Sequence, residues 1–262
     1  MSASLVGSEM CIRDRLRTGN VGEKVILVYL VVCFFVFLAG FVDSIAGGGG
    51  LISLPAYMIA GLPVHTAIAT NKMSSSMGTF VASFHYMKKG FMKWKICIPA
   101  VFGAIAGSWI GSHLALLISE KALKIAMLVV LPVILFYVLR SKALKGKDEN
   151  ATEVINGMLI FKSILIAAVV GIYDGIYGPG TGTFLMLLFT GFCHMTLNDA
   201  AGATKAINLT TNITALVVFL INGKVLLPLG IAAGVCNMAG NYLGSHSFTS
   251  NGHKIVLSLI HI

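Results

Sequence analysis

The chain has 262 residues, of which 56% are hydrophobic and only 11% are charged, and its mean hydropathy is +0.88. Soluble domains carry roughly 25% charged residues because their surface faces water, so this composition excludes a soluble globular domain. The net charge of +9 does not indicate nucleic-acid binding, because the basic residues gather in short connections at 88–95 and 140–147. Lys and Arg mark the cytoplasmic loops of membrane proteins in this way.

Apolar segments follow one another along the chain, and many are near the 20 residues or so that cross about 30 Å of hydrocarbon. They are predicted at 25–45, 46–62, 66–87, 96–118, 122–140, 157–177, 180–195, 199–221 and 225–245. The second and seventh segments are short, and glycine and proline residues interrupt or precede them. The predicted fold class is all-α: a polytopic integral membrane protein with two related halves and Gly-rich broken helices.

Five regions are predicted. Residues 1–24 are expected to be a non-native or disordered N-terminus, because the polar string SLVGSEMCIRDR is unlike the sequence that follows. The first membrane repeat occupies 25–140, a polar cytoplasmic linker 141–156, and the second membrane repeat 157–254. Residues 255–262 are expected to be a truncation artefact, since a new apolar segment has just begun there.

The two halves contain the same features in the same order: an Asp at a helix end, a Gly-rich break, a short apolar segment, and a Lys inside the next helix. The offset is 131 positions for the first two motifs and 133 for the last. This order indicates an internal duplication, and the sequence leaves open whether the repeats are parallel or inverted. The motif pairs are GFVDSI at 40–45 with GIYDGI at 171–176, GGGG at 47–50 with GPGT at 178–181, and ATNK at 69–72 with GATK at 202–205.

These motifs resemble the TauE/SafE sulfite-exporter family, also known as the toluene sulfonate uptake permeases, and in particular its YfcA-like branch. The resemblance covers residues 25–254. It implies a multi-pass permease of the inner (plasma) membrane that moves sulfite, organosulfonates or related organosulfur compounds. The residues that carry it are GFVDSIAGGGGLISLP at 40–55, ATNKM at 69–73, YDGIYGPGTGTF at 173–184 and ATKAINLTTN at 203–212.

The two Gly-rich breaks form the first part of the predicted substrate site. Glycine adopts positive φ easily and leaves backbone amides accessible. A helix that begins at such a break directs its positive dipole end into the protein, which suits an anion. Close helix packing by small residues is the alternative. The residues assigned to the site on this basis are Gly47, Gly48, Gly49, Gly50, Gly178, Gly180, Thr181 and Gly182.

Two lysines and two aspartates supply the predicted charges. Lys72 and Lys205 each lie a few residues inside an apolar segment. A buried ammonium group is costly unless it is paired, so each should face the bundle interior and bind an anionic solute; snorkelling to the interface is the alternative. Asp43 and Asp174, at the mouths of the breaks, are predicted to balance these charges or to carry a coupling proton. Helix capping is the alternative for the aspartates.

Asn71, Asn208 and Asn212 are amides in apolar helices, each of which needs a hydrogen-bond partner and either lines the path or joins helices. Of these, Asn71 and Asn208 complete the predicted site. The sequence contains no GxSxG, HExxH or GxxxxGK[ST] motif and no His/Cys cluster at ligand spacing. We therefore predict no catalytic residue, no metal and no cofactor, and a gradient-driven permease for a small anionic solute. An ion channel and a non-transporting membrane scaffold are the alternatives. The oligomeric state stays open.

Overall fold

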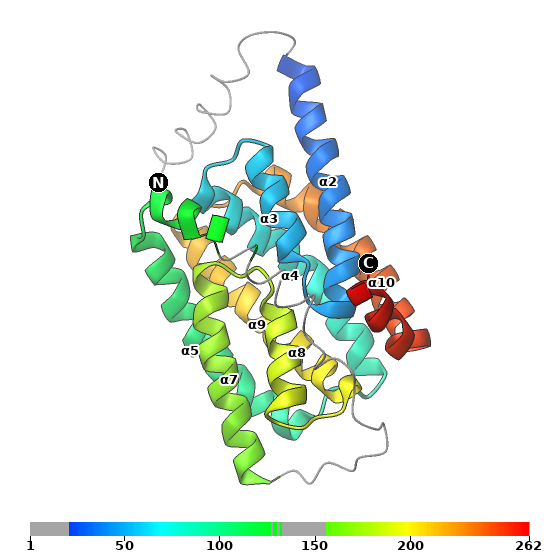
Figure 1. The fold of residues 1–262 in the computed structure, drawn as a ribbon. Helices are drawn as coiled ribbons and strands as arrows, with labels where there is room; N and C mark the ends of the chain where they lie inside the picture. Colours follow the sequence, from blue (N-terminus) through cyan, green and yellow to red (C-terminus); the bar gives the residue numbers. More distant parts are fainter. Residues whose placement is uncertain (1–20, 127, 130–131, 133–155, 262) are drawn as a thin grey trace.

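The structure, a computed structural model, describes residues 21–126, 128–129, 132 and 156–261 (Figure 1). Within these ranges the regular structure is entirely helical, which confirms the all-α prediction. The predicted segment at 122–140 and the linker at 141–156 fall mostly outside the described residues. The helices are α2 (Val21–Ala46), α3 (Gly50–Ile59), α4 (Val64–Lys88), α5 (Trp94–Leu117), α7 (Gly157–Ile176), α8 (Thr181–Gly191), α9 (Leu197–Ile221) and α10 (Leu227–His261).

The described part of the chain holds four helices that are long and apolar enough to cross a membrane: α2 from Val25 onward, α5, α7 and α9. In contrast, α3 has 10 residues and α8 has 11. At about 1.5 Å per residue, each covers roughly half of the hydrocarbon thickness. The two short segments of the sequence are therefore partial helices. Helix α10 is longer than the segment predicted at 225–245 and has 35 residues.

Large apolar side chains cover the outside of the bundle, whereas polar side chains fill much of its middle. Leu30, Phe102 and Phe161 are each more than half exposed, on three different helices. Thr204 and Asn241, which carry polar groups, are fully buried. Soluble proteins show the opposite distribution, and this one is the distribution expected where lipid is the surrounding solvent.

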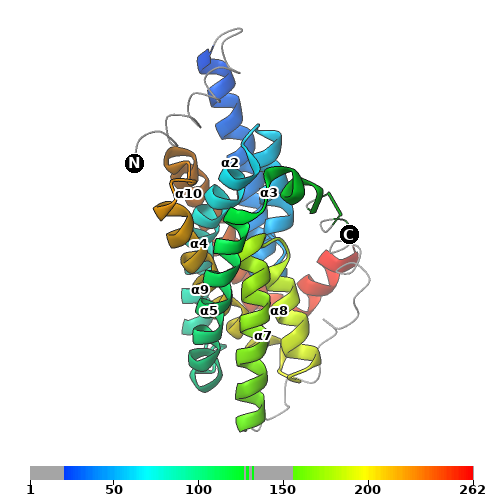
Figure 2. The same cartoon turned by 90° about the vertical axis from the view of Figure 1, so that its left-hand side faces the viewer.

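Helices α2 and α7 run in opposite directions. In both views α2 descends from one end of the bundle to its middle, whereas α7 rises to the same level from the other end (Figures 1 and 2). Each ends at a glycine in the left-handed region: Gly47 with φ of 75° follows α2, and Gly178 with φ of 94° follows the last turn of α7. A side chain would strain both positions, so the glycines define where the long helices stop and the short ones begin.

Small residues allow two helix pairs to pack closely. A side-chain carbon at Gly107 of α5 would overlap the carbonyl oxygen of Ala168 on α7. On the other side of the bundle, a carbon at Gly240 of α10 would overlap the carbonyl oxygen of Phe37 on α2. In a membrane the hydrophobic effect does not drive helices together, because lipid is as apolar as their side chains. Close packing at such backbone contacts is therefore a main source of helix association.

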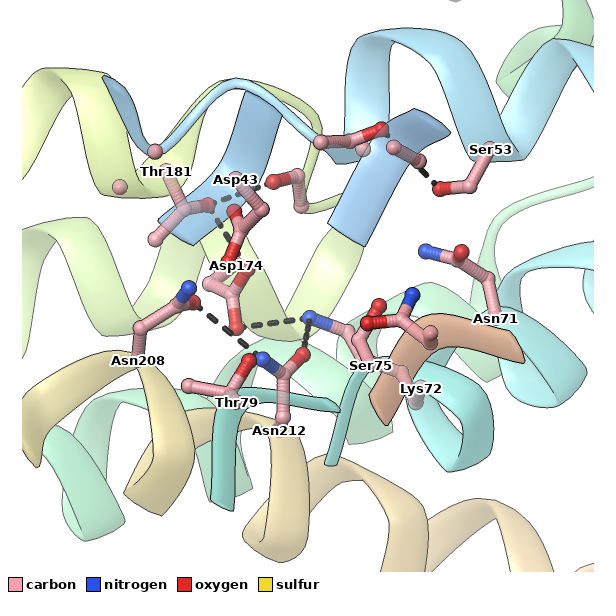
Figure 3. A pocket seen from close by; sticks show the side chains of 17 residues that line it. Asp43, Ser53, Asn71, Lys72, Ser75, Thr79, Asp174, Thr181, Asn208 and Asn212 are labelled. Atoms are coloured by element: carbon pink, nitrogen blue, oxygen red, sulfur yellow. Dashed lines mark hydrogen bonds and ion pairs between the residues drawn. The ribbon is translucent and has the colours of Figure 1, made fainter. Parts of the chain in front are cut away.

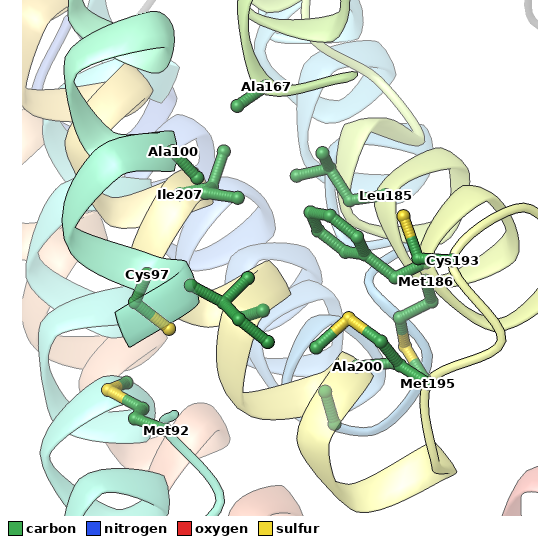
Figure 4. Close-up of a cluster of buried hydrophobic side chains, with 14 of the residues drawn as sticks. Met92, Cys97, Ala100, Ala167, Leu185, Met186, Cys193, Met195, Ala200 and Ile207 are labelled. Atoms are coloured by element: carbon green, nitrogen blue, oxygen red, sulfur yellow. The ribbon is translucent and has the colours of Figure 1, made fainter. Parts of the chain in front are cut away.

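A polar layer lies between two buried apolar clusters. Along α4, Val64 and Ile68 belong to one cluster, and Ala82 and Tyr86 to the other, with the polar residues 70–79 between them. Helix α9 passes through the same layers in the reverse order. The cluster in Figure 4 joins α5, α7, α8 and α9, and its labelled members are Met92, Cys97, Ala100, Ala167, Leu185, Met186, Cys193, Met195, Ala200 and Ile207.

Candidate functional site

The two Gly-rich turns touch each other in the middle of the bundle. The backbone N–H of Thr183 donates to the carbonyl oxygen of Gly47 at 3.2 Å, and the Thr183 hydroxyl donates to the carbonyl oxygen of Ala46 at 2.8 Å. A side-chain carbon at Gly47 would overlap the backbone of Gly182. The glycines are therefore needed for this close approach of two chain segments as well as for their turns.

Helices α3 and α8 both begin at this junction, so their positive ends meet there. The N–H groups of Gly48, Gly49 and Gly50 donate to no acceptor in the described part of the chain. At the start of α8, the N–H of Thr181 instead closes a turn to Gly178 at 3.2 Å. The N–H groups of Gly180 and Gly182 likewise have no acceptor among the described residues. The free backbone donors that the glycine runs predict are thus present at both breaks.

A small cavity of about 20 Å³ lies beside the junction (Figure 3). This space is on the scale of one water molecule, so the cavity is narrow. The cavity wall is contributed by α2, α3, α4, α9 and α10 and by the segment from α7 to α8. Its residues are Ala39, Asp43, Gly47, Gly49, Gly50, Ser53, Asn71, Lys72, Ser75, Thr79, Asp174, Gly178, Thr181, Gly182, Asn208, Asn212 and Asn237.

Two ion pairs cross between the predicted halves. Lys72 of α4 lies 2.7 Å from Asp174 of α7, measured from Nζ to Oδ2, and Lys205 of α9 lies 2.8 Å from Oδ2 of Asp43 on α2. The side chains of Lys72 and Asp174 are each 2% exposed, whereas that of Asp43 is 14% exposed. Neither lysine snorkels to an interface, and each is held by a carboxylate, which lowers the cost of burying both charges.

Further hydrogen bonds fix the first pair. Lys72 also donates to Oδ1 of Asn212 at 3.1 Å, and the Thr181 hydroxyl donates to Oδ1 of Asp174 at 2.7 Å. The Asn212 amide in turn donates to Oδ1 of Asn208 at 3.3 Å (Figure 3). Within the described residues, the side-chain amide nitrogens of Asn71, Asn208 and Asn237 have no acceptor. The amide oxygen of Asn71 is also buried and has no donor in this part of the chain. The cavity wall therefore offers three unused amide donors and one unused amide acceptor.

Most of the predicted site residues meet at this cavity. Gly48 and Gly180 lie in the adjoining turns, and Lys205 is separated from the cavity wall by its partner Asp43. The predicted residues in the wall itself are Gly47, Gly49, Gly50, Asn71, Lys72, Gly178, Thr181, Gly182 and Asn208, together with Asp43 and Asp174.

The predicted site omitted several polar residues of the wall: Ser53, Ser75, Thr79, Asn212 and Asn237. Asn237 stands in the apolar run GIAAGVCNMAGNYLG of α10, outside both repeated motifs. The criterion that selected Asn71, an amide within an apolar helix, would also have selected it. The serine and threonine hydroxyls gave no such signal, because these residues often bond to their own helix backbone.

Comparison with known proteins identifies the family. The family model described as Sulfite exporter TauE/SafE matches residues 32–260. The chain belongs to the TauE/SafE family. It is 34% identical over 236 residues to the probable membrane transporter protein YfcA of Escherichia coli (strain K12), covering 88% of this chain and 85% of that protein.

Two other relatives of this TauE/SafE protein carry similar names. The probable membrane transporter protein ORF9 of Sinorhizobium sp is 33% identical over 224 residues, which is 86% of this chain and 84% of that protein. The probable membrane transporter protein YdhB of Bacillus subtilis (strain 168) is 21% identical over 237 residues, covering 88% and 93%. No solved structure matches the chain. The protein is thus a multi-pass membrane protein from a family of transporters, not of enzymes.

Proposed function

We propose that this TauE/SafE protein is a gradient-driven permease for small anions and that the central cavity is its substrate site. One observation carries the proposal: Lys72 is buried beside donor groups that have no acceptor in the described residues. An oxyanion could accept from the ammonium group, from the amides of Asn71 and Asn208, and from the free N–H groups at the start of α3. Charge-assisted hydrogen bonds of this kind are about twice as strong as neutral ones.

The proposed substrates are sulfite, organosulfonates or related organosulfur compounds. The family description names sulfite, and the site chemistry supports a small anion with several oxygen acceptors. The relatives are named only as membrane transporters, so their names do not narrow the substrate further. We place the protein in the inner membrane, with the basic connection at 88–95 on the cytoplasmic side, because clustered lysines favour that side.

The charges at the centre favour coupling to a second ion. The ammonium groups of Lys72 and Lys205 are balanced by the carboxylates of Asp43 and Asp174. An incoming anion would leave a net negative charge in a surrounding of low dielectric constant, which is unfavourable. We propose that one of the two aspartates takes up a proton when the anion binds, and that this proton couples transport to a gradient.

We further propose that the two halves are inverted repeats that alternate access to the site. The opposite directions of α2 and α7 support inversion (Figure 1). The reciprocal exchange of ion-pair partners supports a two-fold relation between the halves. Central sites between broken helices are common in transporters with this plan. A cavity of about 20 Å³ favours an alternating-access permease over an open ion channel.

The test is sulfite transport by the purified protein in liposomes, compared with the Lys72→Ala variant and with Lys95→Ala as a matched control. Lys95 is an exposed lysine at the start of α5, away from the cavity. We expect the wild type and Lys95→Ala to transport sulfite and Lys72→Ala to lose at least nine-tenths of the rate, about the effect of 1.4 kcal/mol or more. Full transport by folded Lys72→Ala would overturn the site. No transport by the wild type would remove sulfite as the substrate.

A further inference from the structure

We infer that Asn237 on α10 is a direct substrate ligand that gives the central site its preference for anions with oxygen acceptors. This inference rests on the proposed function and goes beyond it, because Asn237 lies outside both repeated motifs. Its side chain is 4% exposed and forms part of the cavity wall. A polar group so deeply buried is expected to have hydrogen-bond partners for its donors as well as its acceptors.

The neighbouring residue Asn241 determines which end of Asn237 is available. The Asn241 amide donates to Oδ1 of Asn237 at 2.6 Å and to the Asn237 backbone carbonyl at 3.1 Å. The side-chain carbonyl of Asn237 is therefore occupied, and its NH₂ group has no acceptor among the described residues. The amide oxygen of Asn241 is buried and has no donor in the described part of the chain, but Asn241 does not belong to the cavity wall. Because the bond from Asn241 polarises the Asn237 amide, the Asn237 NH₂ group is a strengthened donor at the cavity, which suits an anion and not a cation.

Two glycines on other helices make room for this amide pair. A side-chain carbon at Gly78 of α4 would overlap Oδ1 of Asn237. One at Gly40 of α2 would lie 2.6 Å from the Asn237 carbonyl oxygen and 2.9 Å from Nδ2 of Asn241. Both contacts are too close for a larger residue. Glycines on α2 and α4 therefore leave the space that the Asn237 and Asn241 side chains occupy.

The other half of the chain provides an internal comparison. At the offset of 133 positions, Asn237 corresponds to Ala104 of α5, and Gly78 corresponds to Thr211 of α9. The packing agrees with this alignment, since Gly171 of α7 adjoins Ala104 as Gly40 adjoins Asn237.

One half thus pairs a large residue with glycine, and the other pairs alanine with threonine. The volume is preserved in both halves, but only α10 supplies an amide. Both halves therefore contribute charges to the central site, whereas only the second half contributes this amide donor. A single directional donor can distinguish an oxyanion from a halide. An oxyanion can place one oxygen in line with the donor N–H, whereas a spherical halide is attracted by the charges of the site and has no oxygen to align.

The experiment measures binding of sulfite and of bromide to the purified full chain by calorimetry. The first variant is Asn237→Ala combined with Gly78→Thr, which copies the Ala104 and Thr211 pair. The added side chain takes the space left by the Asn237 amide, and the Asn241 amide has to shift, because its Nδ2 lies 2.5 Å from a carbon at position 78. We expect the dissociation constant for sulfite to rise about ten- to hundredfold, the effect of losing a hydrogen bond to a charged group. Bromide binding should change by less than twofold.

A second variant, Asn237→Asp, has the same shape and replaces the donor NH₂ with an acceptor oxygen. We expect it to bind sulfite more weakly than the double variant does, because it adds repulsion to the loss of the donor. Sulfite binding within twofold of the wild type in either variant, with an unchanged melting temperature, would overturn the role of Asn237 and leave the proposed function intact. If the wild type binds no oxyanion, the proposed function fails first, and this inference fails with it.

Discussion

Asp174 on α7 and Lys72 on α4 meet with Oδ2 and Nζ 2.7 Å apart, although they are 102 positions apart in the chain. Each comes from a different predicted half, and both side chains are 2% exposed. A buried pair of this kind does not by itself make a protein more stable than a matched apolar pair would. Removing one partner, however, leaves the other charge buried without compensation.

Lys72→Met should therefore destabilise the protein strongly. The free energy of unfolding should fall by about 3–5 kcal/mol, the usual cost of breaking a buried pair. The double variant Lys72→Met/Asp174→Asn should recover most of this loss, because no isolated carboxylate remains. Denaturant unfolding in detergent would measure both. A double variant as unstable as the single one would show that the lost stability comes from packing and not from the unpaired carboxylate.

The second ion pair should be less sensitive. Lys205→Met leaves Asp43 without its ammonium partner, but the Asp43 side chain is 14% exposed and can be partly hydrated. We expect its loss of unfolding free energy to be smaller than that of Lys72→Met, by about 1 kcal/mol or more, since water screens an exposed charge. The two variants should be unfolded side by side in one detergent. Equal losses would mean that the difference in exposure has no energetic effect.

Gly47→Ala should prevent folding or greatly reduce the yield of folded protein. The substitution forces a side chain into positive φ and into contact with Gly182 at the junction of the two turns. Gly61→Ala is the matched control, because Gly61 also has positive φ, of 88°, but nothing lies within 4 Å of the added carbon. The control should lose only the cost of backbone strain, about 1–2 kcal/mol. Size-exclusion profiles and melting temperatures would compare them, and similar behaviour would contradict a close junction.

Inverted repeats predict opposite sidedness for the loops that follow the two short helices. In a cysteine-free background, Gly61→Cys after α3 and Gly191→Cys at the end of α8 should react with a membrane-impermeant maleimide from opposite sides of the membrane. Gly90→Cys, in the basic connection after α4, should react from the same side as Gly191→Cys. All three positions have open space for a side chain. Labelling of Gly61→Cys and Gly191→Cys from one side would favour parallel repeats instead.

The helical class and the positions of the breaks followed from the sequence because they depend on local chemistry. Apolar segment length predicts the long helices, and glycine runs such as Gly47–Gly50 predict where they stop. The depth in the bundle at which each short helix begins was harder to predict. That depth depends on the contact between Gly47 and Gly182, which belong to segments far apart in the chain. The pattern of residues within one segment carries no information about such a contact.

The central charges were predictable as a set, but their pairing was not. An ammonium group inside an apolar helix demands a partner, so Lys72 and Asp174 could both be selected from sequence. That each lysine pairs with the aspartate of the other half required the helices to be placed in space. Asn237 could have been selected by the criterion that selected Asn71, an amide within an apolar helix, but it lies outside the predicted repeat motifs, from which all the predicted site residues come.

The two apolar clusters on either side of the polar layer have an unequal composition. The one shown in Figure 4 contains Met92, Met186 and Met195 in addition to three aromatic residues, whereas the other contains three aromatic residues and no methionine among its buried members. Thioether side chains adapt their shape easily. Under the proposed mechanism a solute leaves the centre by separating the residues of one cluster. We expect the methionine-containing cluster to separate more easily than the other.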